Sequence, residues 1–128
     1  MKMNTKLVLG IRLVFGLLLI AIGSLAFMNL PVPDFYPPHA LAFLQALSDT
    51  GYMNYVMGVI EIFVGLMFVT RKYVALGAVL LAPISVNIVL FHLFLDLTTI
   101  LPGLVLFALN LFIAYTEWDK YKPLLKSR

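Results

Sequence analysis

Four long runs of apolar residues, nearly free of charge, constrain this chain more than any other feature. They cover residues 7–28, 52–69, 73–95 and 101–118. A helix of about 20 apolar residues crosses the roughly 30 Å of hydrocarbon in a bilayer. The sequence is 62% hydrophobic, whereas soluble domains are about 45–50% apolar. We therefore predict an all-α fold, a transmembrane four-helix bundle that forms a single integral membrane domain over residues 1–128.

The connection between the first two runs contains a short amphipathic stretch. Four prolines, Pro31, Pro33, Pro37 and Pro38, interrupt any helical pattern up to residue 38. Proline suits the first turn of a helix, and apolar residues continue at helical spacing to residue 47. A helix over 38–47 is too short to cross the membrane. We expect it to lie in the interface or to cover the bundle as a lid.

Lysine and arginine gather in three of the segments outside the apolar runs. They are Lys2 and Lys6 before the first run, Arg71 and Lys72 after the second, and Lys120, Lys122, Lys126 and Arg128 after the fourth. The other two connections contain neither residue type. Since basic residues stay on the cytoplasmic side, both termini and the turn at Arg71 are predicted to be cytoplasmic. The net charge of +3 reflects these topology signals, and no nucleic-acid partner is predicted.

The sequence offers few residues for metal or redox chemistry. Cysteine is absent, which excludes disulfides, thiolate metal sites and thiol exchange by the chain itself. No glycine-rich phosphate loop or HExxH motif occurs, so no cofactor is evident. His39 and His92 both belong to the predicted outer side, but they lack ligand spacing, and no metal site is predicted.

Each apolar run has one face of small or polar residues when it is drawn as a helix at about 100° per residue. These faces hold Thr5, Arg12, Gly16, Gly23 and Ala26 in the first run, Asn54, Gly58, Glu61, Gly65 and Phe68 in the second, Ala78, Ala82, Ser85, His92 and Asp96 in the third, and Gly103, Asn110, Ala114 and Glu117 in the fourth. Asn87 falls on another side of the third run. Small residues let helices approach closely in lipid, so we expect the four faces to turn inward.

Three polar residues form a predicted inner cluster. Residue counting places Arg12, Glu61 and Asn110 within roughly one helical turn of depth. A carboxylate inside the membrane takes up a proton or finds a cation, and an arginine can hold it with two hydrogen bonds. Glu61 and Arg12 are then either a structural ion pair between two helices or a proton relay or ligand anchor.

A predicted outer cluster lies at the end of the third run. His92 and Asp96 are one turn apart, and a carboxylate there can fix the tautomer of the imidazole. The proline-rich loop brings Asp34, Tyr36 and His39 to the same side. The pair is either an acid–base or ligand-binding pair or a histidine capped by its neighbour.

Pro83 predicts a kink near the middle of the third run. It leaves the carbonyl of Val79 without its helical donor, and Ser85 or Asn87 is close enough to replace that donor. A kink beside polar residues is found at ligand sites and in plain bundles alike. Asn87 is either a hydrogen bond between helices or a ligand contact.

Several stretches together carry a family resemblance. They are Arg12-Leu-Val-Phe-Gly16 with Gly23, Leu30-Pro-Val-Pro33, Phe43-Leu-Gln-Ala-Leu-Ser-Asp-Thr-Gly51-Tyr52, Val59-Ile-Glu61-Ile-Phe-Val-Gly65 and Ala82-Pro-Ile-Ser-Val-Asn-Ile-Val-Leu-Phe-His-Leu-Phe-Leu-Asp96. In their order and spacing the chain resembles the DoxX and DoxX-like membrane proteins, four-helix proteins of bacteria and archaea. One position departs from the pattern, because many relatives carry lysine or asparagine where this chain has Ser24.

The resemblance implies a multi-pass protein of the bacterial cytoplasmic (inner) membrane that is linked to redox chemistry. Named members are quinone-reducing subunits of thiosulfate oxidation or are tied to quinone stress. We therefore expect a redox-associated subunit that holds a quinone or similar lipophilic ligand in the bundle. Glu61 and Arg12 would handle protons, and His92 and Asp96 would bind the ligand head.

The expected partners are the lipid bilayer, a redox partner protein and a second copy of the chain. One alternative is a non-enzymatic membrane scaffold, chaperone or assembly factor whose polar groups only stabilise the bundle. Another is a carrier of protons or small molecules, although only four spans and no inverted repeat are visible.

Overall fold

The computed structural model describes residues 4–128, and the part of the chain it describes is helical without strands. Lys2, one of the basic residues counted above, lies outside these residues. The elements are α1 (Thr5–Leu25), α2 (Pro38–Asp49), α3 (Met53–Thr70), α4 (Val74–Leu95), η1 (Leu97–Thr99), α5 (Ile100–Thr116), α6 (Trp118–Tyr121) and η2 (Lys122–Leu125). The prediction of an all-α four-helix bundle is confirmed. Four of the helices are long and apolar enough to cross a membrane, and the chain is a multi-pass membrane protein.

Local hydrogen bonds and backbone angles set the ends of α1. The Asn4 side chain accepts hydrogen bonds from the backbone N–H groups of Lys6 and Leu7, which satisfies two free donors of the first turn. The predicted run extended to residue 28, but the helix ends at Leu25. The next residues form a tight turn that reaches Asn29, whose φ of 52° lies in the left-handed region.

The other boundaries lie close to the predicted ranges. The helix expected over 38–47 continues to Asp49. The Asp49 side chain accepts a hydrogen bond of 2.9 Å from Gln45 Nε2. The turn between α3 and α4 is short because Arg71 and Tyr73 both adopt left-handed backbone angles. The run predicted to reach residue 118 ends instead at Thr116, and the chain continues as the short helix α6.

Helices α1 and α3 pack backbone to backbone through four glycines. A Cβ atom added at Gly65 would lie 2.6 Å from the carbonyl oxygen of Gly16, and one at Gly23 would lie 2.6 Å from that of Gly58. No side chain larger than hydrogen fits at such separations. The two pairs confirm the predicted small-residue faces, and they fix the antiparallel register of the two helices.

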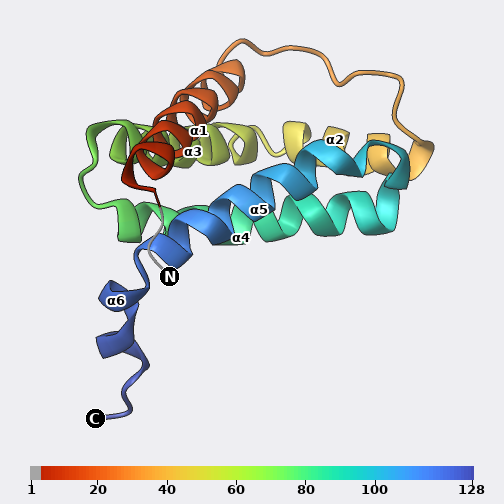
Figure 1. Ribbon diagram of the computed structural model, residues 1–128. Helices are drawn as coiled ribbons and strands as arrows, with labels where there is room; N and C mark the ends of the chain where they lie inside the picture. Colours follow the sequence, from red (N-terminus) through yellow and green to blue (C-terminus); the bar gives the residue numbers. More distant parts are fainter. Residues whose placement is uncertain (1–3) are drawn as a thin grey trace.

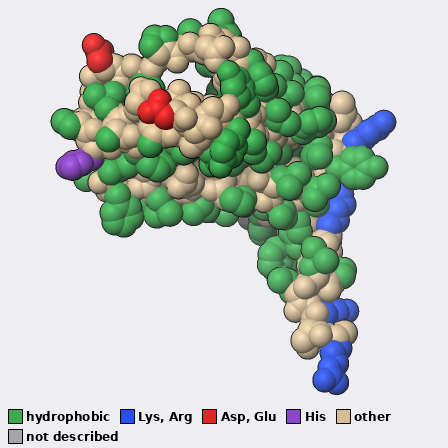
Figure 2. All heavy atoms as spheres, turned by 180° about the vertical axis from the view of Figure 1, so that it is seen from behind, with side chains coloured by type: hydrophobic (Ala, Val, Ile, Leu, Met, Phe, Trp, Pro, Cys, Tyr) green, Lys and Arg blue, Asp and Glu red, His purple; other side chains and the backbone are tan. Residues whose placement is uncertain are grey.

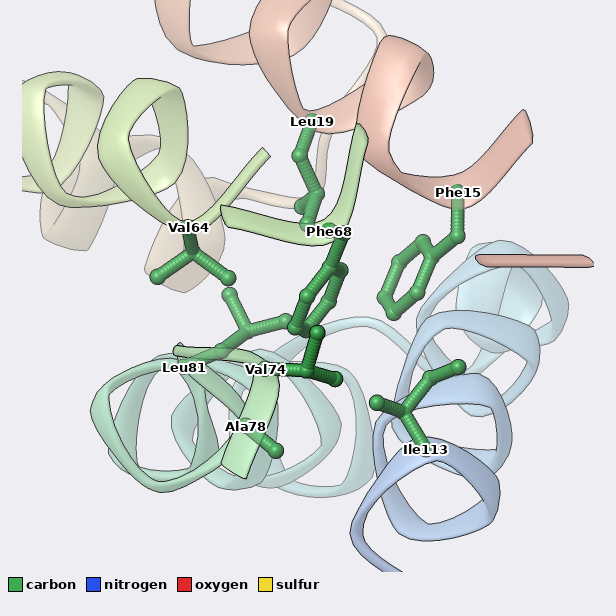
Figure 3. Close-up of a cluster of buried hydrophobic side chains, with 8 residues drawn as sticks. All are labelled: Phe15, Leu19, Val64, Phe68, Val74, Ala78, Leu81 and Ile113. Carbon is green, nitrogen blue, oxygen red and sulfur yellow. The ribbon is translucent and has the colours of Figure 1, made fainter. Parts of the chain in front are cut away.

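The core of the bundle is made by side chains from all four long helices. Figure 3 shows these side chains pointing toward one another: Phe15 and Leu19 from α1, Val64 and Phe68 from α3, Val74, Ala78 and Leu81 from α4, and Ile113 from α5. The rings of Phe15 and Phe68 lie 5.6 Å apart between their centroids. Each of the eight side chains is almost entirely buried, so this cluster joins the α1–α3 pair to the α4–α5 pair.

The helices contact one another largely in chain order, with α1 on α3, α3 on α4, and α4 on α5. The side between α1 and α5 is less closed and carries a groove of about 410 Å³, lined by α1 from Lys6 to Leu18 and by Leu109 of α5. Helix α2 lies across one end of the bundle beside α3 and α4. Figure 1 shows the long loop before α2 arching over this end, and the segment after α5 projecting from the other.

We call these the loop end and the tail end. The loop end holds residues 26–37, α2 and η1, and the tail end holds the start of α1, the turn at Arg71 and α6. On the face shown in Figure 2, lysine and arginine side chains gather at the tail end, whereas acidic and histidine side chains lie at the loop end. The tail is held by the Tyr121 hydroxyl, which donates to the carbonyl oxygen of Ala75 at 2.7 Å.

Candidate ligand pocket

A pocket of about 590 Å³ lies at the loop end, between the last turns of α1, the first half of α3, α2 and the arched loop. Figure 2 shows the hollow beneath this loop. The lining combines apolar residues with several polar side chains, namely Asn29, Tyr36, Ser48, Tyr52, Asn54, Tyr55 and Glu61. A site of this kind suits a ligand that has both a polar head and an apolar body.

Glu61 is the one carboxylic acid, and no basic side chain occurs, among the described residues that line this pocket. It lies eight residues beyond the first residue of α3, which corresponds to a depth of about 12 Å along the helix. The side chain is half-buried, and it makes no hydrogen bond or ion pair with any residue from 4 to 128. A carboxyl group accepts hydrogen bonds when ionised and also donates one when protonated. It is therefore free to bond a ligand in either state.

The mouth of the pocket is held by a contact between the loop and α3. The Tyr55 hydroxyl donates a hydrogen bond of 2.5 Å to the side-chain oxygen of Asn29, and the Tyr55 ring packs on Phe27 with centroids 5.4 Å apart. Ile22 and Leu25 line the pocket and are also 37% and 49% exposed on the outside of α1. One wall of the pocket is therefore continuous with the lipid-facing surface.

The predicted pairing of Arg12 with Glu61 is wrong. Gly16 packs on Gly65, so Arg12 lies level with the region around Val69, about 12 Å from Glu61 along the bundle. The prediction counted residues from the basic positions and assumed that α1 and α3 enter the membrane at the same depth. The packing of Gly16 on Gly65 instead places Arg71 level with Gly10. Arg12 is buried, forms no ion pair within residues 4–128, and its Nε atom has no hydrogen-bond partner there.

Asn110 makes no hydrogen bond with Glu61 and instead joins α5 to α4. Its side-chain oxygen accepts a hydrogen bond of 2.7 Å from the Ser85 hydroxyl, and its amide donates to the carbonyl oxygen of Ala78 at 3.0 Å. Ser85 also lies 3.1 Å from the carbonyl oxygen of Ala82. Both side chains are buried and satisfied. The Asn110 amide bonds the carbonyl oxygen of Ala78, and the Ser85 hydroxyl bonds that of Ala82, so neither reaches the carbonyl of Val79. The prediction that Ser85 or Asn87 replaces the missing donor of Val79 is therefore wrong.

His92 and Asp96 contact each other, but not through the predicted groups. His92 Nδ1 lies 3.1 Å from the backbone carbonyl oxygen of Asp96. The Asp96 carboxylate instead accepts hydrogen bonds from the hydroxyls of Thr98, at 2.6 Å, and Thr99. These bonds hold the pKa of Asp96 below its ordinary value. The buried carboxylate thus shapes the turn from α4 into η1 and α5, outside the lining of the pocket.

Asn87 and His39 both point away from the predicted sites. Asn87 is exposed on the outside of α4 and does not line the pocket, so both of its predicted roles, a hydrogen bond between helices or a ligand contact, stay predictions. His39 is exposed near the start of α2. Within residues 4–128, no group of three or more His, Cys, Asp or Glu side chains is placed to hold a metal ion.

Of the seven polar residues that line the pocket, only Glu61 was among the predicted site residues. Asn54 lies seven residues before Glu61 on the same face of α3, a spacing that the sequence already contains. Asn29 directly follows the first apolar run, where its bond to Tyr55 depends on how the chain turns. The helical period was therefore a sufficient signal for Asn54, and no sequence signal identified Asn29.

The chain was also compared with known proteins. No family model, no curated protein and no solved structure matches it. The resemblance to the DoxX family therefore stays a prediction from the sequence stretches given above.

Proposed function

We propose that this protein is a DoxX-like, redox-associated membrane subunit that binds a lipophilic ligand of the quinone class in the loop-end pocket. The observation that carries the proposal is the Glu61 carboxyl group, which has no partner among residues 4–128 and lies in a pocket whose wall continues into the lipid-facing surface. A ligand dissolved in the bilayer would enter beside Ile22 and Leu25. Its apolar body would remain against α1 while its head reached the polar side chains.

The contacts of the head group follow from the pocket lining. Quinone carbonyl oxygens accept hydrogen bonds, and the Asn54 amide and a protonated Glu61 can both donate them. Glu61 would also exchange a proton with the ligand. Electron transfer is assigned to a redox partner protein. Arg12, His92 and Asp96 take no part in this site, which is the main change from the expectation based on the sequence.

We also propose that the tail end faces the cytoplasm of a bacterium and the loop end faces the outside of its inner membrane. The support is the distribution of charge, because Lys6, Arg71, Lys72 and the basic residues after α5 all belong to the tail end. The ligand pocket would then open toward the outer leaflet.

The test is the binding of a short-chain ubiquinone to the purified protein and its Glu61→Leu variant, because leucine is close in size and has no donor. Loss of a hydrogen bond between neutral groups weakens binding by about 0.5–1.5 kcal/mol, so we expect Kd to increase about two- to tenfold. Glu117→Leu is the matched control, because Glu117 lies at the tail end and pairs with Lys120. Its Kd should equal that of the unchanged protein.

An equal Kd for Glu61→Leu and the unchanged protein, or no binding to either, would contradict the proposal. A lipid extract of gently purified protein provides a second measurement, since a bound quinone is recognised by its absorbance. Absence of both signals would favour the alternative, a membrane scaffold or assembly factor whose polar groups only stabilise the bundle.

A further inference from the structure

Asn87 is an exposed polar side chain well inside the span of α4. It lies eight residues before the last residue of the helix, which places it about 12 Å inside the loop end of the span. Its amide makes no hydrogen bond with any residue that the structure describes. The other exposed polar side chains of the long helices either lie near a helix end or bond their own backbone, as Ser24 does. An amide in hydrocarbon without a partner is unfavourable, so one is needed from outside the chain.

The surface around Asn87 has the spacing of a helix-pairing seam. The exposed residues Leu76, Leu80, Pro83, Asn87, Leu90 and Phe94 follow one another at alternating intervals of four and three. This alternation is the heptad pattern by which two helices pack side by side, with these residues at the a and d positions. Asn87 occupies an a position, where a single asparagine fixes the register of paired helices.

This seam lies away from the rest of the bundle. The buried residues of α4, Val74, Gly77, Ala78, Leu81 and Ser85, occupy the opposite side of the helix. Figure 1 shows α4 at the edge of the bundle farthest from α1. None of the six seam residues lines the loop-end pocket. The seam is thus open to a partner while the pocket is in use, and it does not depend on the proposed ligand.

We propose that two copies of this chain pair in parallel along the α4 seam, with the two Asn87 amides bonded to each other. An amide side chain both donates and accepts, so two copies related by a two-fold axis satisfy each other. Copies carry the same topology signals and insert in the same direction, which makes the two α4 helices parallel. Side-chain amides are known to link helices in this way in lipid.

The experiment uses single cysteines, because the chain contains none, so no disulfide can form within one copy and a product of twice the mass joins two copies. Leu90→Cys places a thiol at a d position of the seam, facing its symmetry mate. Leu18→Cys is the matched control, since it is exposed to a similar extent (46% against 43%) but lies on α1, the helix farthest from the seam (Figure 1). After mild oxidation in native membranes, we expect a disulfide dimer with Leu90→Cys and at least about threefold less with Leu18→Cys.

The role of the amide is tested by adding Asn87→Leu to Leu90→Cys. Because the side chain at position 87 is exposed, this change leaves the core of each copy intact. Loss of a hydrogen bond between helices in lipid should reduce the disulfide yield about threefold or more. Equal yields for the two cysteine positions, no dimer with Leu90→Cys, or a yield that Asn87→Leu leaves unchanged would each overturn the proposal.

Discussion

The polar residues of the helical part divide into those that bond within the chain and those that do not. Asn110, Ser85 and Asp96 have partners among the described residues, and their bonds join α5 to α4 or shape the turn between them. The side chains of Glu61, Asn87 and Asn54 have none there, and neither does the buried Arg12. A polar group in a bilayer without a partner is a functional candidate by default. This division, which the sequence alone does not reveal, separates structural residues from candidate binding residues.

The Asp96 turn should make the protein sensitive to acid. Hydrogen bonds from Thr98 and Thr99 lower the pKa of Asp96 below its ordinary value of 3.8. A group with a lowered pKa in the folded state stabilises that state above its unfolded pKa, and the contribution is lost as the pH falls through the folded value. The melting temperature of the protein in detergent should therefore decrease below about pH 4.

The control for this prediction is Asp96→Asn, which keeps an acceptor oxygen but does not titrate. Its melting temperature should be lower than that of the unchanged protein at pH 7, and the difference should narrow as the pH falls below about 4. A difference that stays constant over this range would contradict the assignment to Asp96.

At the scale of the helices, the contact between α1 and α3 depends on glycine. The seven-residue spacing of Gly16 and Gly23, and of Gly58 and Gly65, allowed the two faces to be predicted from the sequence. Which glycine meets which was not predictable, because counting from a charged residue does not locate the level at which a helix enters the membrane. The wrong position of Arg12 relative to Glu61 has this cause. Hydrophobic pattern specifies the helices, whereas their register depends on the fit of one backbone against another.

Gly65→Ala should destabilise the protein because the added methyl group would meet the Gly16 carbonyl oxygen at 2.6 Å. Overpacking of this kind costs about 1–3 kcal/mol of unfolding free energy. Unfolding in mixed micelles with increasing SDS measures the loss.

Gly10→Ala provides the matched control on the same pair of helices. Among residues 4–128, no atom outside its own helix lies within 4 Å of a Cβ added at Gly10, and alanine favours the helix more than glycine does. Its unfolding free energy should be unchanged or slightly higher. Similar losses for the two variants would show that α1 and α3 do not pack through Gly65 and Gly16.

At the scale of the whole molecule, the two ends of the bundle differ in charge and in the segments that cover them. Basic residues gather at the tail end, while the pocket, its arched loop and α2 lie at the loop end (Figures 1 and 2). The four spans and the short helix α2 were predictable because the local spacing of apolar residues indicates each of them. The pocket was not, since it arises from how a loop without periodic pattern folds back over α3.

The proposed orientation can be checked by labelling single cysteines in intact cells, again because the chain has no cysteine of its own. Asp34→Cys, exposed on the arched loop, should react with a membrane-impermeant maleimide added from outside. Lys126→Cys, exposed in the tail, should react only after the membrane is permeabilised. The reverse pattern would mean that the pocket opens to the cytoplasm.

The groove between α1 and α5 has a consequence for how the protein should be handled. Along this side the four helices form an incomplete ring, and apolar side chains from Leu7 to Leu18 are left for acyl chains to cover. Annular lipid would thus complete the wall on this side. Delipidation by a harsh detergent would remove that cover from one side only, so α1 and α5 would move apart there first, while the buried cluster still joins α3 to α4.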